Sequence, residues 1–358
     1  MTLALASVLA MIPVGTASAA CTGAWDALPR PTPRAEGISA LSATDAWYVG
    51  YTLDAQGGDQ GFIARWDGSA WTSVPFPEPG EWEMTLGVDA LSANDAWVVG
   101  SYYDTAGDAT RPLFLHWNGI EFIYEFADGG QSPRVFAVDA LAPDDAWAVG
   151  FHFVGGRYKA LVMHWDGVEW LQVPPPAGQG SSYLFDVVAI APDDVWAVGS
   201  AFQAGKGRPY AIHWDGVGWS STPLPDVGTY NPWLSGVDAS SASNVWAVGQ
   251  VENGARTLIV RWNGSRWRRV KSPNLGTRWT GVFDVAALSA TEAFSVGAAN
   301  GGVPVPLRWD GERWRSVRVP GTGRRGLEDI DVTPAGEWFA AGSKSSRSGF
   351  ALQRCPAP

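Results

Sequence analysis

The sequence predicts an all-β protein, a seven-bladed β-propeller with four antiparallel strands per blade, the last blade being completed by the N-terminal strand. Three observations predict it. A unit of about 50 residues recurs seven times, each unit has the pattern of four short strands, and the last unit lacks a fourth strand that the start of the chain supplies. The composition agrees, because 43 glycines and 25 prolines in 358 residues indicate many turns.

Three aromatic positions mark each unit. The first recurs after 50, 50, 49, 50, 48 and 45 residues, at Trp47, Trp97, Trp147, Trp196, Trp246, Phe294 and Phe339. The second lies at Trp66, Trp117, Trp165, Trp214, Trp262 and Trp309, and the third at Trp71, Phe122, Trp170, Trp219, Trp267 and Trp314. Each such ring buries about 150–250 Å² and fills the gap between neighbouring blades. We therefore assign these rings to the core and not to a cofactor site.

The third unit shows the expected strands. Residues 136–142, 147–153, 160–165 and 169–173 are short runs rich in β-forming residues. Pro143-Asp144-Asp145, Gly155-Gly156 and Asp166-Gly167 separate them, and Pro174-Pro175-Pro176 ends the last run. This spacing is typical of one propeller blade.

The N-terminal segment predicts export. An apolar run from Leu3 to Val14 precedes Thr16-Ala17-Ser18-Ala19-Ala20, which resembles a signal-peptide cleavage site. We expect residues 1–19 to form a signal peptide, cleaved after Ala19 or Ala20, and residues 20–358 to form one propeller domain. No Lys or Arg precedes Arg30, so the usual positive start is missing. A membrane anchor is the alternative, but the run is too short to span a bilayer. A lipid on Cys21 is disfavoured by Ser18.

The two ends of the chain match parts of one blade. The segment Gly23-Ala-Trp25-Asp-Ala-Leu-Pro29 matches the fourth strand of the third unit, whereas the seventh unit stops after its third strand with Cys355 where other units have the second Trp. The N-terminal segment should therefore be the outer strand of blade seven. In an oxidising compartment, Cys21 and Cys355 would then lie within disulfide reach, and we predict that they are bonded.

Two polar positions also recur. An acidic or amide residue precedes the first ring, and we interpret it as capping backbone amides of a turn, at Asp45, Asp95, Asp145, Asp194, Asn244, Glu292 and Glu337. An Arg or His precedes the second ring, at Arg65, His116, His164, His213, Arg261, Arg308 and Arg354. Seven-fold symmetry directs these side chains apart, so we assign them to structural hydrogen bonds. His152 alone cannot make a metal site, and no metal or cofactor is expected.

These motifs support one resemblance. Repeated Asp-x-Trp-Ala-Val-Gly units, such as Asp145–Gly150, and His-Trp-Asp-Gly-x-x-Trp units, such as His164–Trp170, resemble a group of secreted bacterial propellers of actinobacterial type. The resemblance covers all seven units. It implies a propeller fold and export, and it implies no activity.

Aromatic residues outside the repeat are the candidate ligand-binding residues. Four of the 21 tryptophans do not fit it. Trp338 directly precedes Phe339, and we interpret it as a register slip. The other three, with two tyrosines, fall in connections between the fourth strand of one blade and the first strand of the next, on the face that also carries Tyr102 and Tyr103. We predict a binding surface there, formed by Trp82, Tyr183, Tyr230, Trp233, Trp279, Arg278 and Arg324; the alternative is that these rings cover blade junctions.

The charge distribution is uneven. Residues 1–250 carry 9 basic and 27 acidic side chains, and residues 251–358 carry 16 and 9. The basic residues gather in units five and six, at Arg266, Arg268, Arg269, Lys271, Arg313, Arg315, Arg318, Arg324 and Arg325. Charge on outer strands deters strand addition, which is one explanation; an anionic polymer or partner is the other. The net charge of −11 and export make nucleic acid an unsuitable partner.

Two functions remain open from the sequence. The first is a monomeric, non-catalytic binding or scaffold protein, secreted or associated with the cell surface, for a carbohydrate or an extracellular protein. The second is a secreted glycan-active enzyme, a polysaccharide lyase or glycosidase, because propellers carry both kinds of function. Acids outside the repeat exist at Glu81, Glu83, Asp226, Glu328 and Asp329, but no pair has a spacing that indicates catalysis, so no catalytic residue is predicted.

Overall fold

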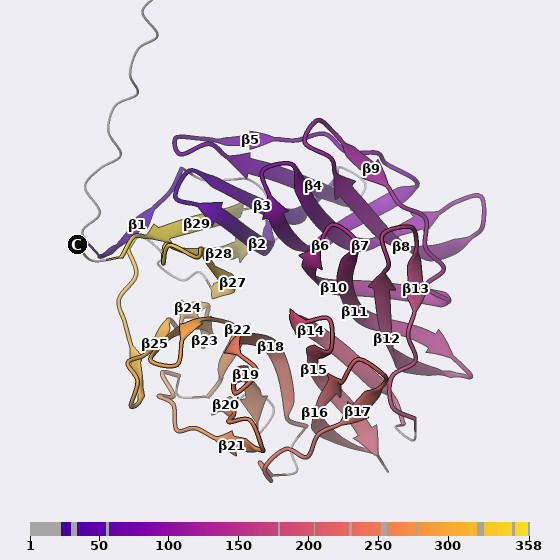
Figure 1. Cartoon of the computed structure of the whole chain (residues 1–358). Coiled ribbons are helices and arrows are strands. Elements are labelled where there is room, and N and C mark those ends of the chain that lie inside the picture. Colours follow the sequence, from indigo (N-terminus) through magenta and orange to yellow (C-terminus); the bar gives the residue numbers. More distant parts are fainter. Residues whose placement is uncertain are drawn as a thin grey trace, which may run out of the picture.

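Seven β-sheets surround a central channel (Figure 1). The computed structural model describes residues 23–29, 34–54, 57–177, 180–203, 205–228, 231–251, 256–276, 278–320, 326–345 and 348–356. None of these residues lies in a helix, and each sheet has its strands antiparallel. The predicted seven-bladed propeller is confirmed.

The first three blades follow one pattern, with the inner strand first and the outer strand last. Blade 1 has β2 (Arg34–Ser42), β3 (Asp45–Leu53), β4 (Asp59–Trp66) and β5 (Trp71–Ser73). Blade 2 has β6 (Glu81–Ser92), β7 (Asp95–Asp104), β8 (Ala109–Trp117) and β9 (Phe122–Tyr124). Blade 3 has β10 (Gln131–Ala142), β11 (Asp145–Val154), β12 (Arg157–Trp165) and β13 (Trp170–Gln172).

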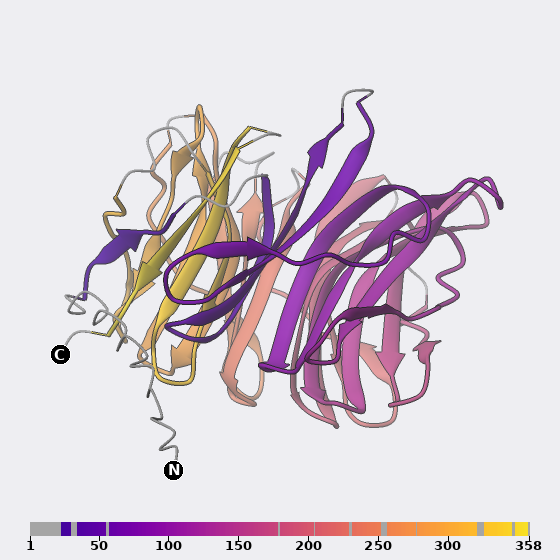
Figure 2. The same cartoon turned by 90° about the horizontal axis from the view of Figure 1, so that it is seen from above.

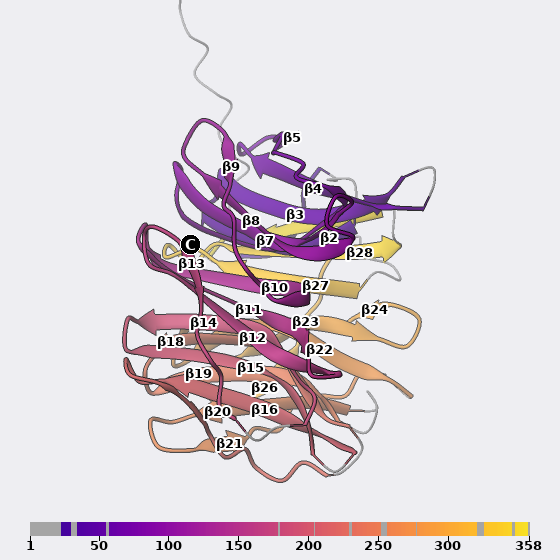
Figure 3. The same cartoon turned by 90° about the vertical axis from the view of Figure 1, so that its right-hand side faces the viewer.

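The next three blades repeat the order, and blade 6 has one additional short strand. Blade 4 has β14 (Ser182–Ala191), β15 (Asp194–Gln203), β16 (Lys206–Trp214) and β17 (Trp219–Ser221). Blade 5 has β18 (Trp233–Ser241), β19 (Asn244–Val251), β20 (Arg256–Trp262) and β21 (Trp267–Arg269). Blade 6 has β22 (Thr280–Ser289), β23 (Glu292–Ala299), β24 (Val303–Pro304), β25 (Leu307–Trp309) and β26 (Trp314–Ser316). The side view shows the blades following one another around the ring (Figure 3).

Blade 7 is built from both ends of the chain. Its order is β1 (Trp25–Ala27), β29 (Ser348–Arg354), β28 (Trp338–Ser345) and β27 (Gly326–Val332), and Trp25 pairs with Arg354. In Figure 2 the indigo strand β1 lies beside the yellow strand β29. The predicted closure by the N-terminal strand is confirmed. Cys355 directly follows β29, but Cys21, like all of residues 1–22, lies outside the described residues, so the disulfide and the signal peptide stay predictions.

The alignment of blade 7 that the sequence suggested is wrong by one residue. Trp338 pairs with Arg354 and Phe339 with Gln353, so Arg354 occupies the position of the second Trp and Cys355 lies beyond it. Trp338 is not a register slip. It is 1% exposed and its ring centre lies 4.5 Å from that of Phe294, where the second Trp of another blade would contact its neighbour. Trp338 thus fills the volume that a missing strand-three Trp would leave empty.

Aromatic rings join each blade to the next, as predicted. The first ring of one blade contacts the second and third rings of the following blade; Trp147, for example, lies 5.2 Å from Trp214 and 5.4 Å from Trp219. At the junction between blades 6 and 7, Trp25 takes the place of the third ring and lies 5.7 Å from Phe294. The core is therefore a ring of inter-blade contacts rather than one central cluster.

The Arg and His residues before the second ring are structural, as predicted. His164 Nε2 lies 2.9 Å from Asp145 Oδ1 and its ring lies 4.3 Å from that of Trp147, while Arg65 pairs with Asp45 at 2.8 Å. The prediction that these residues cap turn amides is wrong, because in blades 1 to 6 their side chains pair with the strand-three Arg or His. In blade 7 Glu337 accepts a hydrogen bond from the Thr333 hydroxyl. Serines cap that turn in some blades, as the hydroxyl oxygen of Ser92 does for the amide of Asn94.

Candidate functional site

Every inner strand contains a β-bulge at the same place. The register between the first two strands of blade 3 shifts between Val135 and Ala137, opposite Gly150, and equivalent shifts occur in all seven blades. A Cβ on Gly150 would lie 1.9 Å from the carbonyl oxygen of Arg134. The glycine of each Ala-Val-Gly motif therefore leaves room for a bulge, and a bulge redirects one side chain.

The bulged residues form a ring at one mouth of the channel. This mouth lies on the face that carries the strand two–three loops and the connections between blades, which we call the mouth face; the opposite face, with its tight turns, is the turn face. The seven residues all line the central cavity of about 260 Å³ and differ in chemistry, being Glu36, Leu86, Phe136, Phe185, Ser235, Phe283 and Glu328. At this position, which we call the mouth ring, the residue type differs among the blades although the backbone geometry repeats.

Below the mouth ring, carboxylates join the inner strands across the blade junctions. An Asp Oδ2 of one blade accepts a backbone N–H of the next at 2.6–2.9 Å, in the pairs Asp89–Ala140, Asp139–Ala189, Asp186–Val237, Asp238–Ala287, Asp284–Ile330, Asp329–Ile38 and Asp331–Ala40. Ser39 Oγ does the same for Ala90 at 3.1 Å. These acids are therefore structural, including Asp329, which the sequence marked as an acid outside the repeat.

The channel carboxylates titrate abnormally. Burial, together with the charges of neighbouring acids, raises the pKa of Asp238 to about 7 and that of Asp331 to about 8. Burial and the carboxylate of Asp329 raise the pKa of Asp284 well above its usual value, and the two side chains are hydrogen-bonded to each other. A protonated carboxyl keeps one oxygen as an acceptor, so the junctions survive protonation.

An aromatic cluster adjoins the mouth ring on blades 3 and 4. Phe136 and Phe185 of the ring lie 5.6 Å apart, and Phe151 lies 5.3 Å from Tyr183 and 5.1 Å from Tyr158. We call the connected set of rings the blade 3–4 aromatic cluster; it comprises Phe136, Phe151, Phe153, Tyr158, Tyr183, Phe185 and Phe202. None of the seven is fully buried, and Tyr158 is 42% exposed. A continuous, partly exposed aromatic surface of this kind is typical of a binding site.

The opposite part of the mouth ring is polar. Glu36 and Glu328 come from the neighbouring blades 1 and 7, and Arg34 Nε lies 2.6 Å from Glu36 Oε1. Burial raises the pKa of Glu36 to about 7, with Arg34 opposing and the charge of Glu328 adding to the effect. Burial raises the pKa of Glu328 as well. The mouth thus offers aromatic faces on one side and hydrogen-bonding and ionisable groups on the other.

The structure distributes the predicted ligand-binding residues over several blades. Tyr183 belongs to the aromatic cluster, Trp279 lies 5.9 Å from Phe283 of the mouth ring, and Trp82, 51% exposed, lies 5.1 Å from Tyr103. Trp233 is partly exposed and Arg278 exposed. Among the described residues no ring contact joins Trp82, Tyr183 and Trp279 to one another. Tyr230 and Arg324 lie outside the described residues.

Strand boundaries differ from those expected. Trp82, Tyr183 and Trp233 lie within β6, β14 and β18, not in connections, because the bulged inner strands extend further toward the mouth face than the repeat indicates. Sequence reasoning missed Glu36 and most of the aromatic cluster. The signal for Glu36 was available, because an acid stands where four of the other six units have an apolar residue.

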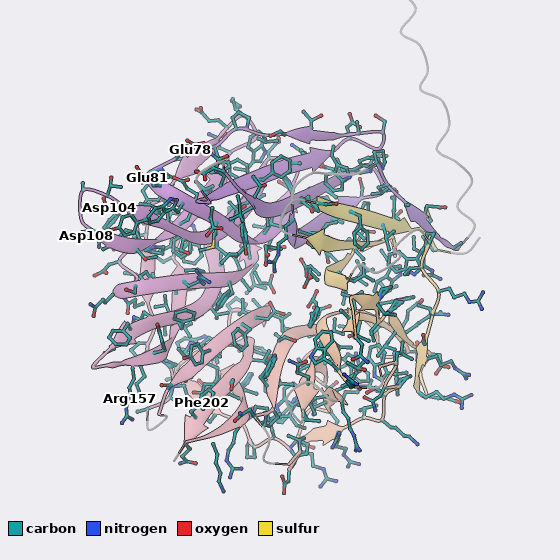
Figure 4. The ribbon with its side chains drawn as sticks, turned by 180° about the vertical axis from the view of Figure 1, so that it is seen from behind. Glu78, Glu81, Asp104, Asp108, Arg157 and Phe202 are labelled. Atoms are coloured by element: carbon teal, nitrogen blue, oxygen red, sulfur yellow. The ribbon has the colours of Figure 1, made fainter. Side chains whose placement is uncertain are left out.

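The rim of the mouth face has further charged groups. In Figure 4, Glu78 is labelled in the connection before β6, and Glu81, Asp104 and Asp108 are labelled on blade 2. Arg157 of blade 3 and Phe202 of blade 4 are labelled there as well. Asp104 pairs with Arg111 at 3.5 Å, and the hydroxyl of Tyr103 donates to Asp108. Within the described ranges, no group of three or more His, Cys, Asp or Glu side chains is arranged to hold a metal ion. No helix there is long and apolar enough to cross a membrane.

Comparison with known proteins identifies structural neighbours. No protein-family model and no curated protein matches the sequence. Among solved structures, YCF48 bound to a D1 peptide is similar with a TM-score of 0.60 and 18% identity, over 92% of this chain and 96% of that one. YCF48 from Cyanidioschyzon merolae has a TM-score of 0.60 and 16% identity, over 93% and 98%. The fucose-specific lectin from Aleuria aurantia has 0.50 and 15%, over 80% and 97%. These likenesses show the fold.

Proposed function

We propose that the protein is a glycan-binding propeller, acting outside the cell or at its surface, whose ligand lies on the mouth face across the blade 3–4 aromatic cluster. The observation that carries the proposal is the continuous set of partly exposed rings that runs from the mouth ring to the rim at Tyr158 and Phe202. Sugar rings have apolar faces that pack on aromatic side chains and hydroxyl groups that need polar partners.

The polar part of the mouth ring supports the same proposal. Arg34 supplies donors, and Glu36 and Glu328 supply acceptors, at the edge of the cavity that the aromatic rings adjoin. A peptide ligand would use the same surfaces, and one structural neighbour is described as bound to a peptide while another is a fucose-specific lectin. The test must therefore include both kinds of ligand.

The experiment compares a glycan array and a peptide array on the wild-type protein and on the double variant Tyr158→Ser/Phe202→Ala. We expect glycan binding that weakens at least tenfold in the variant while the fold is kept, because Tyr158 is 42% exposed and Phe202 is partly exposed. The matched control is Ile120→Ala/Val217→Ala, which removes two side chains that are 84% and 88% exposed in turn-face hairpins. Binding of peptides alone, or equal losses in both double variants, would contradict the proposal.

A glycan-active enzyme is the second candidate, and a specific observation favours it. Only blades 1 and 7 have an acid at the bulge position, Glu36 and Glu328, and both line the cavity. Both have raised pKa values, that of Glu36 being about 7. A carboxyl with such a pKa beside a second carboxylate is the pairing that glycoside hydrolysis uses. Release of reducing ends from any polysaccharide, abolished by Glu36→Gln without loss of binding, would establish this candidate over simple binding.

A further inference from the structure

The outer strands of blades 5 and 6 differ in charge from those of the other five blades. After Trp267 the chain continues Arg268-Arg269-Val270-Lys271, after Trp314 it continues Arg315-Ser316-Val317-Arg318, and an arginine precedes each ring. The five equivalent stretches contain no Lys or Arg and read Trp25-Asp-Ala-Leu-Pro29, Trp71-Thr-Ser-Val-Pro75, Phe122-Ile-Tyr-Glu-Phe126, Trp170-Leu-Gln-Val-Pro174 and Trp219-Ser-Ser-Thr-Pro223.

Protection of sheet edges does not explain this difference. All seven outer strands are edges, each paired with the third strand of its blade. Charge on an edge hinders the addition of another strand, and that need is the same around the whole ring. Five of the edges carry no cation and are still protected from strand addition. The cations on the two adjacent blades therefore require another cause.

These cations are exposed and mostly unpaired. Seven exposed basic side chains belong to the two edges, namely Arg266, Arg268, Arg269, Lys271, Arg313, Arg315 and Arg318. Of these seven, only Arg315 forms an ion pair with another described residue, Asp310. Unneutralised positive charge therefore concentrates on one sector of a protein whose net charge is −11.

A hollow of about 640 Å³ lies in the blade 5 part of this sector. Its lining residues contain four cations and no carboxylate, being Ser243, Arg261, Asn263, Arg268, Arg269, Val270 and Lys271. One substitution within the repeat also removes the carboxylate that would pair with the lining residue Arg261. In blade 1 the partner of Arg65 is Asp45, at 2.8 Å, whereas in blade 5 the partner of Arg261 is Asn244, at 2.6 Å. Among the described residues, Arg261 thus has no carboxylate partner.

We propose that this hollow and the two adjoining edges bind a linear anionic polysaccharide, through its sulfate or carboxylate groups. Arginine predominates among the cations, and its planar donors fit such oxyanions bidentately. Corresponding positions on two blades carry the charges, as with Arg268 and Arg315, so a ligand with repeated charges can contact both. Trp267 and Trp314 are 4% and 3% exposed, so no ring is available for stacking on nucleic acid bases. Neither edge has the exposed large apolar side chains that membrane insertion uses.

The test measures binding of heparin, polygalacturonate and neutral dextran to the full mature chain at low and high salt. The variant Arg268→Ser/Arg269→Ser copies the outer strand of blade 4, where Ser220 and Ser221 occupy the same positions, so folding should be kept. A second variant, Asn244→Asp, restores the carboxylate that pairs with the arginine in blade 1. We expect heparin or polygalacturonate to bind wild type, binding at least tenfold weaker in the double variant, and a smaller loss with Asn244→Asp.

The control Lys206→Ser/Arg208→Ser removes two exposed cations from blade 4 and should leave binding within twofold. Unchanged affinity in Arg268→Ser/Arg269→Ser, an equal loss in the control, or equally tight binding of single-stranded DNA or anionic vesicles would overturn the proposal. The mouth-face variant Tyr158→Ser/Phe202→Ala should bind the polyanions normally, which separates this surface from the glycan site proposed above.

Discussion

The two faces of the propeller are built by opposite rules. On the turn face the same contacts recur from blade to blade, as in the pairing of Asp95 with His116 and of Asp145 with His164, at 2.8 and 2.9 Å. On the mouth face the bulged position changes its chemistry from blade to blade, from Phe136 to Ser235 to Glu328. Positions that recur in every blade therefore have structural roles, and positions that differ among the blades are the candidate functional ones.

The largest effect on stability should come from removing a bulge that creates the mouth ring. Gly150→Ala would place a Cβ 1.9 Å from the carbonyl oxygen of Arg134, so the inner strand must shift or lose its bulge. We expect a loss of about 3 kcal/mol or more in the free energy of unfolding, measured by chemical denaturation. Gly218→Ala in a turn-face hairpin is the control, because a Cβ there meets nothing within 4 Å. Similar stability of the two variants would show that the bulge does not require glycine.

The next largest effect should come from removing one carboxylate between blades. Asp139→Ala leaves the amide of Ala189, now bonded at 2.7 Å, without this acceptor, and we expect a loss of about 2 kcal/mol, measured by thermal and chemical denaturation. Asp139→Asn keeps an acceptor oxygen and should cost clearly less. If both substitutions cost the same, the charge rather than the hydrogen bond would hold the junction.

The stability of the protein should also depend on pH, through the buried carboxyl groups of the channel. The pKa values of Asp238 and Asp331, about 7 and about 8, lie above the roughly 3.9 of an unfolded Asp. Between about pH 4 and pH 8 the folded protein therefore binds more protons than the unfolded chain, so stability falls as pH rises through this window. We expect a lower melting temperature at pH 8 than at pH 5, and a smaller difference in Asp238→Asn, whose amide can still accept from Ala287. A melting temperature that rises over this range would contradict the raised pKa values.

The smallest effect should come from exchanging repeat residues on the turn face. His164→Arg imitates blade 1, where Arg65 stacks 4.9 Å from the ring centre of Trp47 and pairs with Asp45. We expect a change of at most about 0.5 kcal/mol in the free energy of unfolding and no change in ligand binding. His164→Ala, which removes both contacts, should cost about 1 kcal/mol. A strong loss of binding in His164→Arg would place function on the turn face.

The fold could be predicted because its determinants repeat along the chain. Three recurring ring positions, an Asp-Gly or Asn-Gly hairpin in each of the first six blades and a displaced fourth strand at Trp25 are visible as sequence spacing. The exchange between Trp338 and Arg354 could not be predicted, because it depends on which side chain fills a volume between two blades, and alignment by residue type favoured the wrong register.

The site could be predicted only in part. Phe151 and Phe153 belong to an ordinary second strand in the repeat, and they become part of a surface only because Tyr183 and Phe202 of the next blade pack beside them. Similarly, the repeated glycine indicates a close backbone approach, but a strict two-residue alternation does not show that the bulge beside Gly50 places Glu36 at the cavity. Contacts between blades, not spacing within one, decide both features.

The shared seventh blade has a consequence for biosynthesis. Because β1 pairs with β29, β1 has no partner until β29, more than 300 residues later in the sequence, has been synthesised. The six blades between these two strands can assemble in the order of translation, but blade 7 cannot. A truncation that removes Ser348–Arg354 would therefore leave β1 and β28 each with an unpaired edge, which favours aggregation.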